Sequence, residues 1–539
     1  MTKKPSKPYA RPGFRSQRRV AANAPSRWTQ RLLSAKWLPE PNLAFANGGL
    51  STDPKEGLSL YGPYGLSSGE HREQIRVGIV GTEITIAQAR LLLEKCSNLI
   101  PGVAGKRRQY PDFPGLNMET AFQAELITNQ AWASPISQRD LASVVTLSDK
   151  VQGFEAAVEL FSSRVSLISE LDVVDVIVCA LPQEIEDFYG SIGPSEVRAS
   201  PSGHLSPLAR AVRRLIHDAE ARGQTSFLEQ IYPEEASATP GLLSRNFRRA
   251  LKAKTNRANC PVQILRQRSL VENDPTAQDP ASRAWNMTVG LYFKARGRPW
   301  QVQGLDPMAC YIGVSFFHHI TEESHTVHSS TAQLFTAQGD SIVLRGEKFE
   351  WDAERQGRSP HLSGDYARNL ITNILQKYYD YKQLYPRRVV IHKTSKYYDD
   401  ERRGFGDGLV QSNIAQYDLV SLDTTGVRFF REGAYPPIRG TWCQLGQAGQ
   451  WLYTLGYLPT QGTYPRAHVP KPLQISDKHG DSTYETLWSE ILALSKMNWN
   501  SADYASALPI TMLFARKVGE ILTYLPDDAE PNPNFRFYC

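Results

Sequence analysis

The stretch Ser244-Arg-Asn-Phe-Arg-Arg-Ala-Leu-Lys-Ala-Lys254 predicts an amphipathic helix with one basic face. Ser244 is of a residue type that caps helices, and Phe247 and Leu251 stand one turn apart on the apolar face. Basic side chains recur at helical spacing on the other face: Arg245, Arg248, Arg249 and Lys252. We therefore expect a helix over residues 244–255 with a cationic face.

A short strand with an amide side chain is expected directly after this helix. The chain continues as Cys260-Pro-Val-Gln-Ile264, where the proline ends the helical unit and the apolar run around Gln263 predicts a strand. A basic helix face is most often simply solvated. Here it precedes a strand-borne amide, and Lys294 ends a further predicted strand at a Gly/Pro turn. Together these groups predict a pocket for a terminal phosphate, and therefore a nucleic-acid ligand.

The overall charge of the chain is small, so such a pocket would have to arise from local clustering of positive charge. The chain has 539 residues, of which 41% are hydrophobic and 22% charged, and a net charge of +6, which suits a soluble protein of two or three domains. Six scattered cysteines without a CxxC pair predict a reducing compartment and no cysteine-based metal site. The sequence has neither an apolar run long enough to span a membrane nor a signal-peptide core, so a cytoplasmic protein without membrane attachment is expected.

The first half alternates strands with helices, which predicts a parallel, doubly wound, Rossmann-like sheet. In such sheets ligands bind beyond the carboxyl ends of the strands. Strands are expected at 74–81, 171–182 and 261–266, with a further apolar stretch at 285–295, and helices at 84–96, 208–223 and 244–255.

The second half predicts an RNase-H-like domain, because three antiparallel strands are followed by a helix and then a strand. The three strands form a meander with glycines at the turns. In chain order the expected strands are 308–320, 331–339, 340–350, 387–395, 419–423 and 427–433, with a helix at 366–381 before the fourth strand and a C-terminal helix at 505–523.

The N-terminus is basic and rich in proline. Residues 1–36 hold ten Lys or Arg and no acidic residue, so residues 1–40 are interpreted as a disordered, solubilising tail. An arm that touches nucleic-acid phosphates is the alternative. Residues 41–72 form a Gly/Pro-rich lead-in segment, and the two domains follow at 73–305 and 306–539.

Carboxylates are missing where a two-metal nuclease would need them. The first strand of the second domain, Cys310–Phe317, contains none, and the strand 389–395 ends in Lys and Thr. Asp399 and Asp400 come too late in the chain to lie at that strand's end. Glu347 and Glu350 lack acidic partners, so the nuclease hypothesis fails on its chemistry.

Two further motifs are weak. His318, His319, His325 and His328 lie close in sequence, but their spacing matches no regular face and no carboxylate or cysteine completes a metal site. The run GIVGTE at 78–83 lacks the third glycine and the lysine of nucleotide-binding loops.

Taken together, these sequence features resemble a short prokaryotic Argonaute, which consists of a MID and a PIWI domain only. The resemblance covers nearly everything after residue 40 and rests on four blocks. These are PNLAFANGG…GLSLYGPYG at 41–65, NFRRALKAKTNRANCPVQIL…WNMTVGLYFKARGRPW at 246–300, CYIGVSFF at 310–317 and RRVVIHKTS at 387–395. It implies an α/β fold with a Rossmann-like MID domain followed by an RNase-H-like PIWI domain.

The resemblance also implies which residues hold the 5′ phosphate of a guide. The matching positions are Arg248, Lys252, Gln263 and Lys294, and Arg248 replaces the aromatic ring or histidine usual in the family. Family members place the C-terminus beside the same phosphate. This implies a structural Mg²⁺ there, bound with Gln263 and the main-chain carboxylate of Cys539.

The PIWI tetrad of cleaving Argonautes is replaced in this sequence. Its first, third and fourth positions look like Ser315, Thr394 and Arg516, so the resemblance implies a catalytically inactive PIWI domain. Short Argonautes pair with a protein that carries an APAZ region and an effector domain: TIR, sirtuin-like or nuclease. Their guide is usually RNA and their target single-stranded DNA.

The leading hypothesis is thus a non-cleaving, guide-RNA-binding subunit of a prokaryotic defence complex against viruses and plasmids. Pairing of the guide with single-stranded target DNA would activate the APAZ-effector partner. An active guide-directed endonuclease is the alternative. A single-strand binder that ignores the 5′ phosphate is a third possibility.

Overall fold

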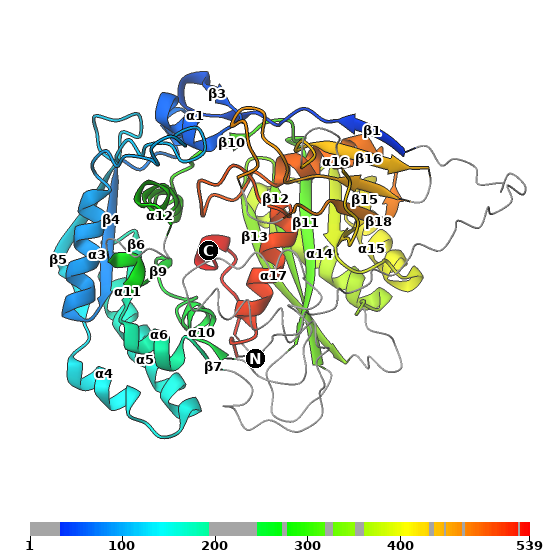
Figure 1. Cartoon of the computed structure of the whole chain (residues 1–539). Helices are drawn as coiled ribbons and strands as arrows, with labels where there is room; N and C mark the ends of the chain where they lie inside the picture. The colour runs from blue at the N-terminus through cyan, green and yellow to red at the C-terminus, as the bar shows by residue number, and fades with distance from the viewer. Residues whose placement is uncertain are drawn as a thin grey trace, which may run out of the picture.

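The computed structural model describes residues 33–192, 245–271, 278–318, 327–350, 360–430, 436–446, 449–465, 469–526 and 529–539. Two sheets, one of four strands and one of nine, stand on opposite sides of the molecule (Figure 1). The C-terminal helix α17 (Ile510–Leu522) runs between them and contacts elements of both units. The expected helix 208–223 and residues 1–32 lie outside the described residues.

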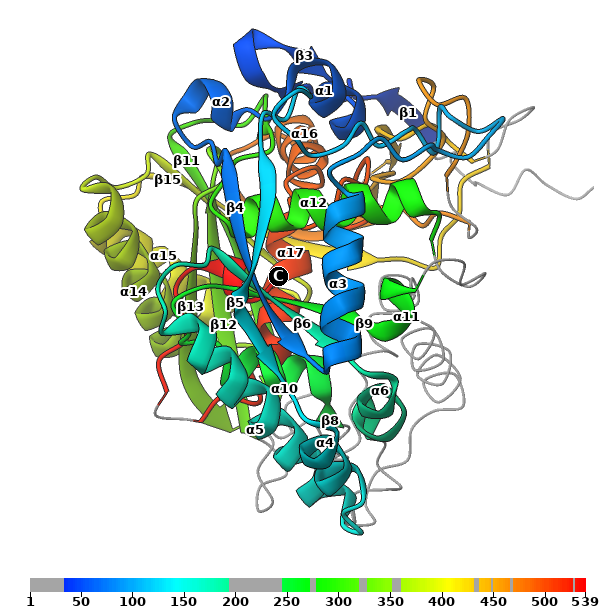
Figure 2. The same cartoon turned by 90° about the vertical axis from the view of Figure 1, so that its left-hand side faces the viewer.

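The first unit is built on a parallel sheet, as predicted. Its strands lie in the order β5-β4-β6-β9, and every pair is parallel. Helix α3 packs on one face, while α5 and α10 pack on the other (Figure 2). The strands are β4 (Gln74–Gly81), β5 (Glu125–Pro135), β6 (Val176–Leu181) and β9 (Val262–Arg266), and the helices are α3 (Glu83–Lys95), α4 (Gln138–Val145), α5 (Lys150–Ser169), α6 (Gln183–Tyr189), α10 (Phe247–Lys254) and α11 (Gln267–Leu270).

The apolar stretch 285–295 is helical, and the prediction that Lys294 ends a strand is wrong. Helix α12 (Pro280–Lys294) begins after Asp279, whose carboxylate accepts a hydrogen bond from the Ser282 N–H, and Pro280 occupies its first turn. Eleven of its fifteen residues are buried. A helix enclosed on nearly all sides lacks a polar face, and its apolar run then resembles a buried strand.

The second unit has the predicted RNase-H-like core. Strands β11, β12 and β13 are antiparallel neighbours, and β14 and β15 continue the sheet parallel to β11. Strand β18 pairs antiparallel with β15 and extends the sheet through β17 and β16. The bounds are β11 (Ala309–His318), β12 (Val327–Thr336), β13 (Ser341–Glu350), β14 (Arg388–Lys393), β15 (Gln416–Thr424), β16 (Thr441–Leu445), β17 (Gln450–Leu452) and β18 (Leu473–Gly480).

Helices cover both faces of this sheet. Helix α14 (Gly364–Lys382) and helix α15 (Asp399–Gln411) pack on one face, in a core of their own with β11 and β14. Helices α16 (Tyr484–Leu494) and α17 pack on the other face, in the core that also encloses α12 and the C-terminal residues. The strand expected at 427–433 is not seen: residues 427–430 form no strand, and residues 431–433 lie outside the described residues.

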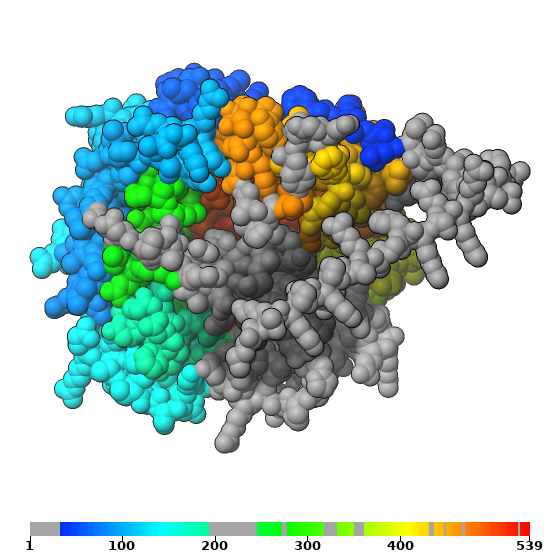
Figure 3. All heavy atoms as spheres, viewed as in Figure 1, coloured from blue at the N-terminus to red at the C-terminus, as the bar shows by residue number. Residues whose placement is uncertain are grey.

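The end of the predicted N-terminal tail is ordered. Strand β1 (Leu33–Trp37) pairs antiparallel with β16 at the edge of the nine-stranded sheet, so disorder does not extend over residues 33–40. The lead-in segment follows as β2 (Leu43–Ala44), β3 (Leu50–Ser51), α1 (Pro54–Tyr61) and α2 (Gly65–Ser68), and β2 pairs with β10 (Gln301–Val302). In Figure 3 these residues, in blue, run along the upper edge over both units.

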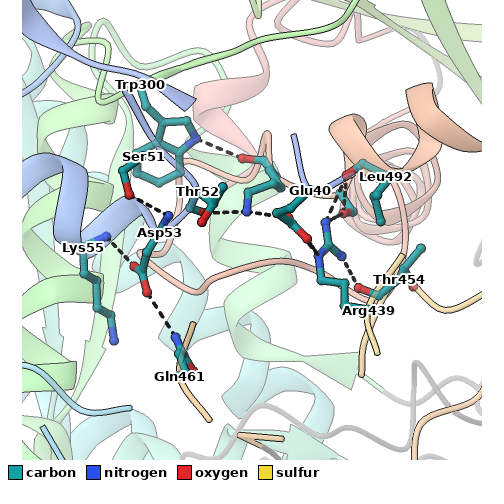
Figure 4. Close-up of polar contacts among 12 residues, drawn as sticks. Glu40, Ser51, Thr52, Asp53, Lys55, Trp300, Arg439, Thr454, Gln461 and Leu492 are labelled. Carbon is teal, nitrogen blue, oxygen red and sulfur yellow. Dashed lines mark hydrogen bonds and ion pairs between the residues drawn. The ribbon is translucent and has the colours of Figure 1, made fainter. Parts of the chain in front are cut away.

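A buried polar cluster holds the lead-in segment in place (Figure 4). The Glu40 carboxylate accepts hydrogen bonds from Arg439 Nε at 2.8 Å and from Lys496 Nζ at 2.7 Å. Lys496 also donates to the Thr52 carbonyl oxygen at 2.6 Å, and its own carbonyl oxygen accepts from Trp300 Nε1 at 2.9 Å. Three distant stretches of the chain therefore meet at one carboxylate.

Candidate nucleic-acid interface

Helix α10 forms where the sequence predicted it, but with a different cap. The Asn246 side chain accepts a hydrogen bond from the Arg249 N–H at 3.1 Å and caps the helix, whereas Ser244 lies outside the described residues. Arg245 precedes the helix in the short strand β8 (Arg245–Asn246). The four predicted basic residues therefore do not share one face.

Neighbouring helices neutralise part of the positive charge of this segment. Arg245 forms an ion pair with Glu155 on α5, and Arg249 forms one with Glu520 on α17 at 2.7 Å. Arg248, in contrast, is exposed, and Lys252 points inward. The four predicted cations are thus divided between two that pair with neighbouring helices, one that is exposed and one that is buried.

Lys252 reaches the C-terminal residue of the chain. Its side chain is 2% exposed, and its ammonium donates hydrogen bonds to the main-chain oxygens of Val262 and Cys539. Val262 is the first residue of β9, so the site lies at the amino end of this edge strand. The expectation that a ligand site lies beyond the carboxyl ends of the strands is wrong for this pocket. A turn of only seven residues joins α10 to β9 and brings the end of the helix to the strand's start.

Lys294 joins the same cluster from α12. It is 1% exposed, and its ammonium donates to the Asn500 side-chain oxygen at 2.7 Å. Burial lowers the pKa of Lys294 to about 8. Cys539 acts to raise this pKa, and the charges of Arg248 and Lys517 act to lower it. Burial, followed by the charges of Lys294 and Arg248, holds the pKa of Lys252 well below its usual range. Closely spaced buried cations of this kind favour an anionic ligand.

Gln263 lies on β9 one residue beyond Val262. Val262 and Ile264 pack into the core beside α5 and α10, so the alternation of the strand directs Gln263 to the opposite face, where α12 lies. Its side-chain nitrogen donates to the Ile264 carbonyl oxygen at 3.3 Å. Gln263 thus directly follows Val262, whose carbonyl oxygen accepts a hydrogen bond from Lys252.

The C-terminal residues are anchored by contacts that the sequence did not indicate. Asn256, just after α10, accepts a hydrogen bond from the Asn532 N–H at 2.7 Å and another from the Tyr538 hydroxyl at 3.3 Å. Phe535 packs against the rings of Phe293 and Phe514. Asn256, Asn500 and Lys517 are the site residues that sequence reasoning missed, and their partners lie more than 200 positions away along the chain.

The donor set suits a divalent cation only together with an anion. Gln263 and the Cys539 main chain offer oxygens, but the Cys539 oxygen accepts from the Lys252 ammonium. Repulsion from the surrounding lysines opposes a bare cation at this position. A phosphate would offset that repulsion, and Gln263 and the Cys539 main chain could then supply oxygen ligands to a cation.

The three expected tetrad positions lie on the predicted elements. Ser315 lies within β11 and Thr394 directly follows β14, each two residues beyond the paired positions Gly313 and His392 of these parallel strands. Arg516 lies on α17 and pairs with Glu520 at 3.3 Å. Glu347 is exposed and accepts a hydrogen bond from Asn369 at 3.0 Å.

Metal ligands are not gathered in the part of the chain that the structure describes. No three His, Cys, Asp or Glu side chains approach closely enough there to hold a metal ion. His319 and His325 lie outside the described residues, as do the side chains of His318 and His328. No helix among the described residues is long and apolar enough to cross a membrane.

The two units together form the MID–PIWI fold of Argonaute proteins, and solved Argonautes match it over more than 90% of this chain. Clostridium butyricum Argonaute bound to a guide DNA and a target DNA matches with a TM-score of 0.58 and 13% identity, over 93% of this chain and 54% of that one. A. aeolicus Argonaute matches with a TM-score of 0.51 and 13% identity, over 93% and 55% of the two chains. Marinitoga piezophila Argonaute in complex with a 5′ OH guide RNA gives a TM-score of 0.51 and 12% identity, over 91% and 60%.

At these identities the likeness defines the fold and no more. The chain spans between 54% and 60% of the length of these solved Argonautes. No protein-family model and no curated protein sequence matches it.

Proposed function

We propose that this chain is a guide-binding subunit that anchors the 5′ phosphate of a guide, expected to be RNA, and pairs it with complementary single-stranded DNA. The convergence of Lys252 and Lys294 on Cys539, at the junction of the two units, carries this proposal. Buried ammonium groups bind a phosphate through charge-assisted hydrogen bonds, which are the stronger kind. The Argonaute fold supports a guide nucleic acid as the source of that phosphate.

Binding of a phosphate would exchange the hydrogen-bond partners of the Lys252 ammonium. An incoming phosphate would replace the Val262 and Cys539 oxygens at the Lys252 ammonium, while Gln263 and Lys294 close on it from β9 and α12. Exposed Arg248 would stack on the first base, as guanidinium planes do. A structural Mg²⁺ would supply charge neutralisation between the phosphate and the Cys539 main chain.

Replacing Lys252 tests the anchor. We expect Lys252→Met, with or without Gln263→Ala, to weaken binding of a 5′-phosphorylated guide RNA about tenfold to a hundredfold, because one charge-assisted bond contributes about 1.5–3 kcal/mol. Lys254→Met is the matched control: Lys254 lies on the same helix, but it is 56% exposed and pairs with Glu159 at the surface. Filter binding with 5′-phosphate and 5′-hydroxyl RNAs measures the effect.

The same assay can overturn the anchor assignment. Equal affinities of the Lys252→Met and Lys254→Met proteins for the 5′-phosphorylated RNA would contradict it. Wild-type protein that binds both RNAs equally well would favour the single-strand binder instead. A parallel series with DNA guides separates the two guide chemistries.

We further infer that this chain binds its target without cutting it. Ser315, Thr394 and Arg516 at the tetrad positions support this, because a two-metal cut needs acidic ligands there. Incubation of the chain with guide, complementary target and Mg²⁺ or Mn²⁺ is expected to leave the target intact. Cleavage that disappears in a Glu347→Gln variant would establish the endonuclease alternative.

Activation of an effector completes the proposal. The short Argonautes that the chain resembles pair with a second protein, and we expect the same of this chain. We propose that this partner carries an APAZ region with a TIR, sirtuin-like or nuclease domain. Defence against viruses and plasmids would then depend on the partner's chemistry.

A further inference from the structure

Two cavities flank the C-terminal segment, and residues 534 and 536 line both of them. The larger, with a volume of about 500 Å³, lies on the side of the nine-stranded sheet and is called here the ring cavity. The smaller, of about 240 Å³, lies beside the amino ends of β6 and β9 and is called the arginine cavity. Neither includes Lys252, Gln263 or Cys539 in its lining.

Aromatic residues from separate elements line the ring cavity, and one of them, Tyr381, is largely exposed. Phe293, Tyr381, Trp499 and Phe535 all line it. The turn at Gly339 holds the Trp499 ring closely: its φ is +88°, and an added Cβ would come within 1.8 Å of a ring carbon. A volume of about 500 Å³ lies within the range of pockets for small molecules and cofactors.

The arginine cavity carries excess positive charge. Five cationic residues line it, against the two acids Asp172 and Asp175. Arg76 is paired with Asp175 at 3.1 Å, and Lys294 is directed to Asn500. The side chains of the other three cations, Arg72, Arg296 and Arg536, make no ion pair or hydrogen bond with any residue that the structure describes.

Arg536 connects the two cavities. Its guanidinium lies 5.0 Å from the centre of the Phe293 ring. Burial, followed by the charge of Arg296, lowers its pKa to about 10, so it remains positively charged at neutral pH. A guanidinium held against a ring, without an anionic partner, retains its full capacity for bidentate binding of a phosphate.

We propose that these cavities form a binding site for a nucleoside phosphate, with its base in the ring cavity and its phosphates against Arg536 and Arg296. Aromatic side chains bind planar bases by stacking, and arginines bind phosphates through paired hydrogen bonds. The site shares Lys294 with the proposed guide anchor, but Lys252, Gln263 and Cys539 do not line either cavity.

The probes are AMP, ADP, ATP and UDP, with adenosine and inorganic phosphate as the separate halves of the ligand. Isothermal titration of the full chain, freed of nucleic acid, is expected to show one site for the nucleotides and at least tenfold weaker binding of either half. Arg536→Gln should weaken nucleotide binding tenfold or more. Arg108→Gln, a change at an exposed arginine outside both cavities, should leave it unchanged.

Two further variants keep the proposal open to refutation if Arg536→Gln fails to fold. Arg296 is exposed and Tyr381 is 61% exposed, so Arg296→Gln and Tyr381→Ala should fold, and each should weaken nucleotide binding severalfold. Absence of nucleotide binding by the wild-type chain would overturn the proposal. So would binding that Lys252→Met abolishes and Arg296→Gln does not, because the nucleotide would then occupy the guide anchor.

Discussion

At the scale of single residues, the charge state of the lysine cluster determines what the pocket can hold. Lys294 and Lys252 are almost fully buried, and burial is the first cause of the lowered pKa of each. In the free protein their ammonium groups therefore lose protons at a lower pH than surface lysines do. Binding of a phosphate would restore the charge, so anchoring and protonation are linked.

This linkage predicts a pH dependence of guide binding. Since the pKa of Lys294 is about 8, affinity for 5′-phosphorylated RNA should fall about tenfold between pH 7 and pH 9 as the free protein loses this proton. The second pKa of the phosphate is about 6, so the phosphate stays mostly dianionic over that range. Lys294→Arg should give a shallower dependence, because arginine keeps its charge. Filter binding across the pH series, with 5′-hydroxyl RNA as control, measures it; an affinity that is constant or rises with pH would contradict the linkage.

At the scale of elements, the sequence predicted those helices and strands that are determined by residues close together in the chain. The strand predicted at 74–81 is β4, and the helix at 366–381 lies within α14, since period and length identify both. Lys252 and Gln263 lie on two further elements of this kind, α10 and β9, and their role in holding a guide stays a prediction. Helix α12 was mistaken for a strand because its burial on nearly all sides removes the helical alternation of polar and apolar residues.

Contacts between distant segments could not be predicted. Asn500 meets Lys294, and Asn256 meets Asn532, across separations of 206 and 276 residues that no local pattern records. Strand β1 lies in a stretch whose basic composition indicates disorder, and pairing with β16 outweighs that composition. Strand β5 was not among the expected strands. Its residues are mostly half-buried or exposed, so it lacks a clear alternation of buried and exposed residues.

At the scale of the whole molecule, the cluster at Glu40 joins the lead-in segment to the nine-stranded unit (Figure 4). Arg439 and Lys496 are each 1% exposed at the side chain, and Glu40 is the carboxylate that both bind. Arg439 also donates to the carbonyl oxygens of Thr454 and Leu492. Removal of the Glu40 charge would leave two buried cations uncompensated, which costs far more than losing an exposed ion pair.

Glu40→Gln should therefore lower the free energy of unfolding by about 3–5 kcal/mol. The control is Glu485→Gln, which breaks the exposed Lys36–Glu485 pair and should cost at most about 1 kcal/mol. Burial raises the pKa of Glu40, but the charges of Arg439 and Lys496 outweigh burial, and the pKa is lowered overall. The contribution of Glu40 to stability is therefore present above the unfolded-state pKa near 4.5 and is lost as the pH falls below it. Urea titrations at pH 7 and pH 4 should then show a larger acid-induced loss of stability in the wild type than in Glu40→Gln. Equal costs of the two substitutions at pH 7 would mean that the lead-in segment is held by its apolar contacts instead.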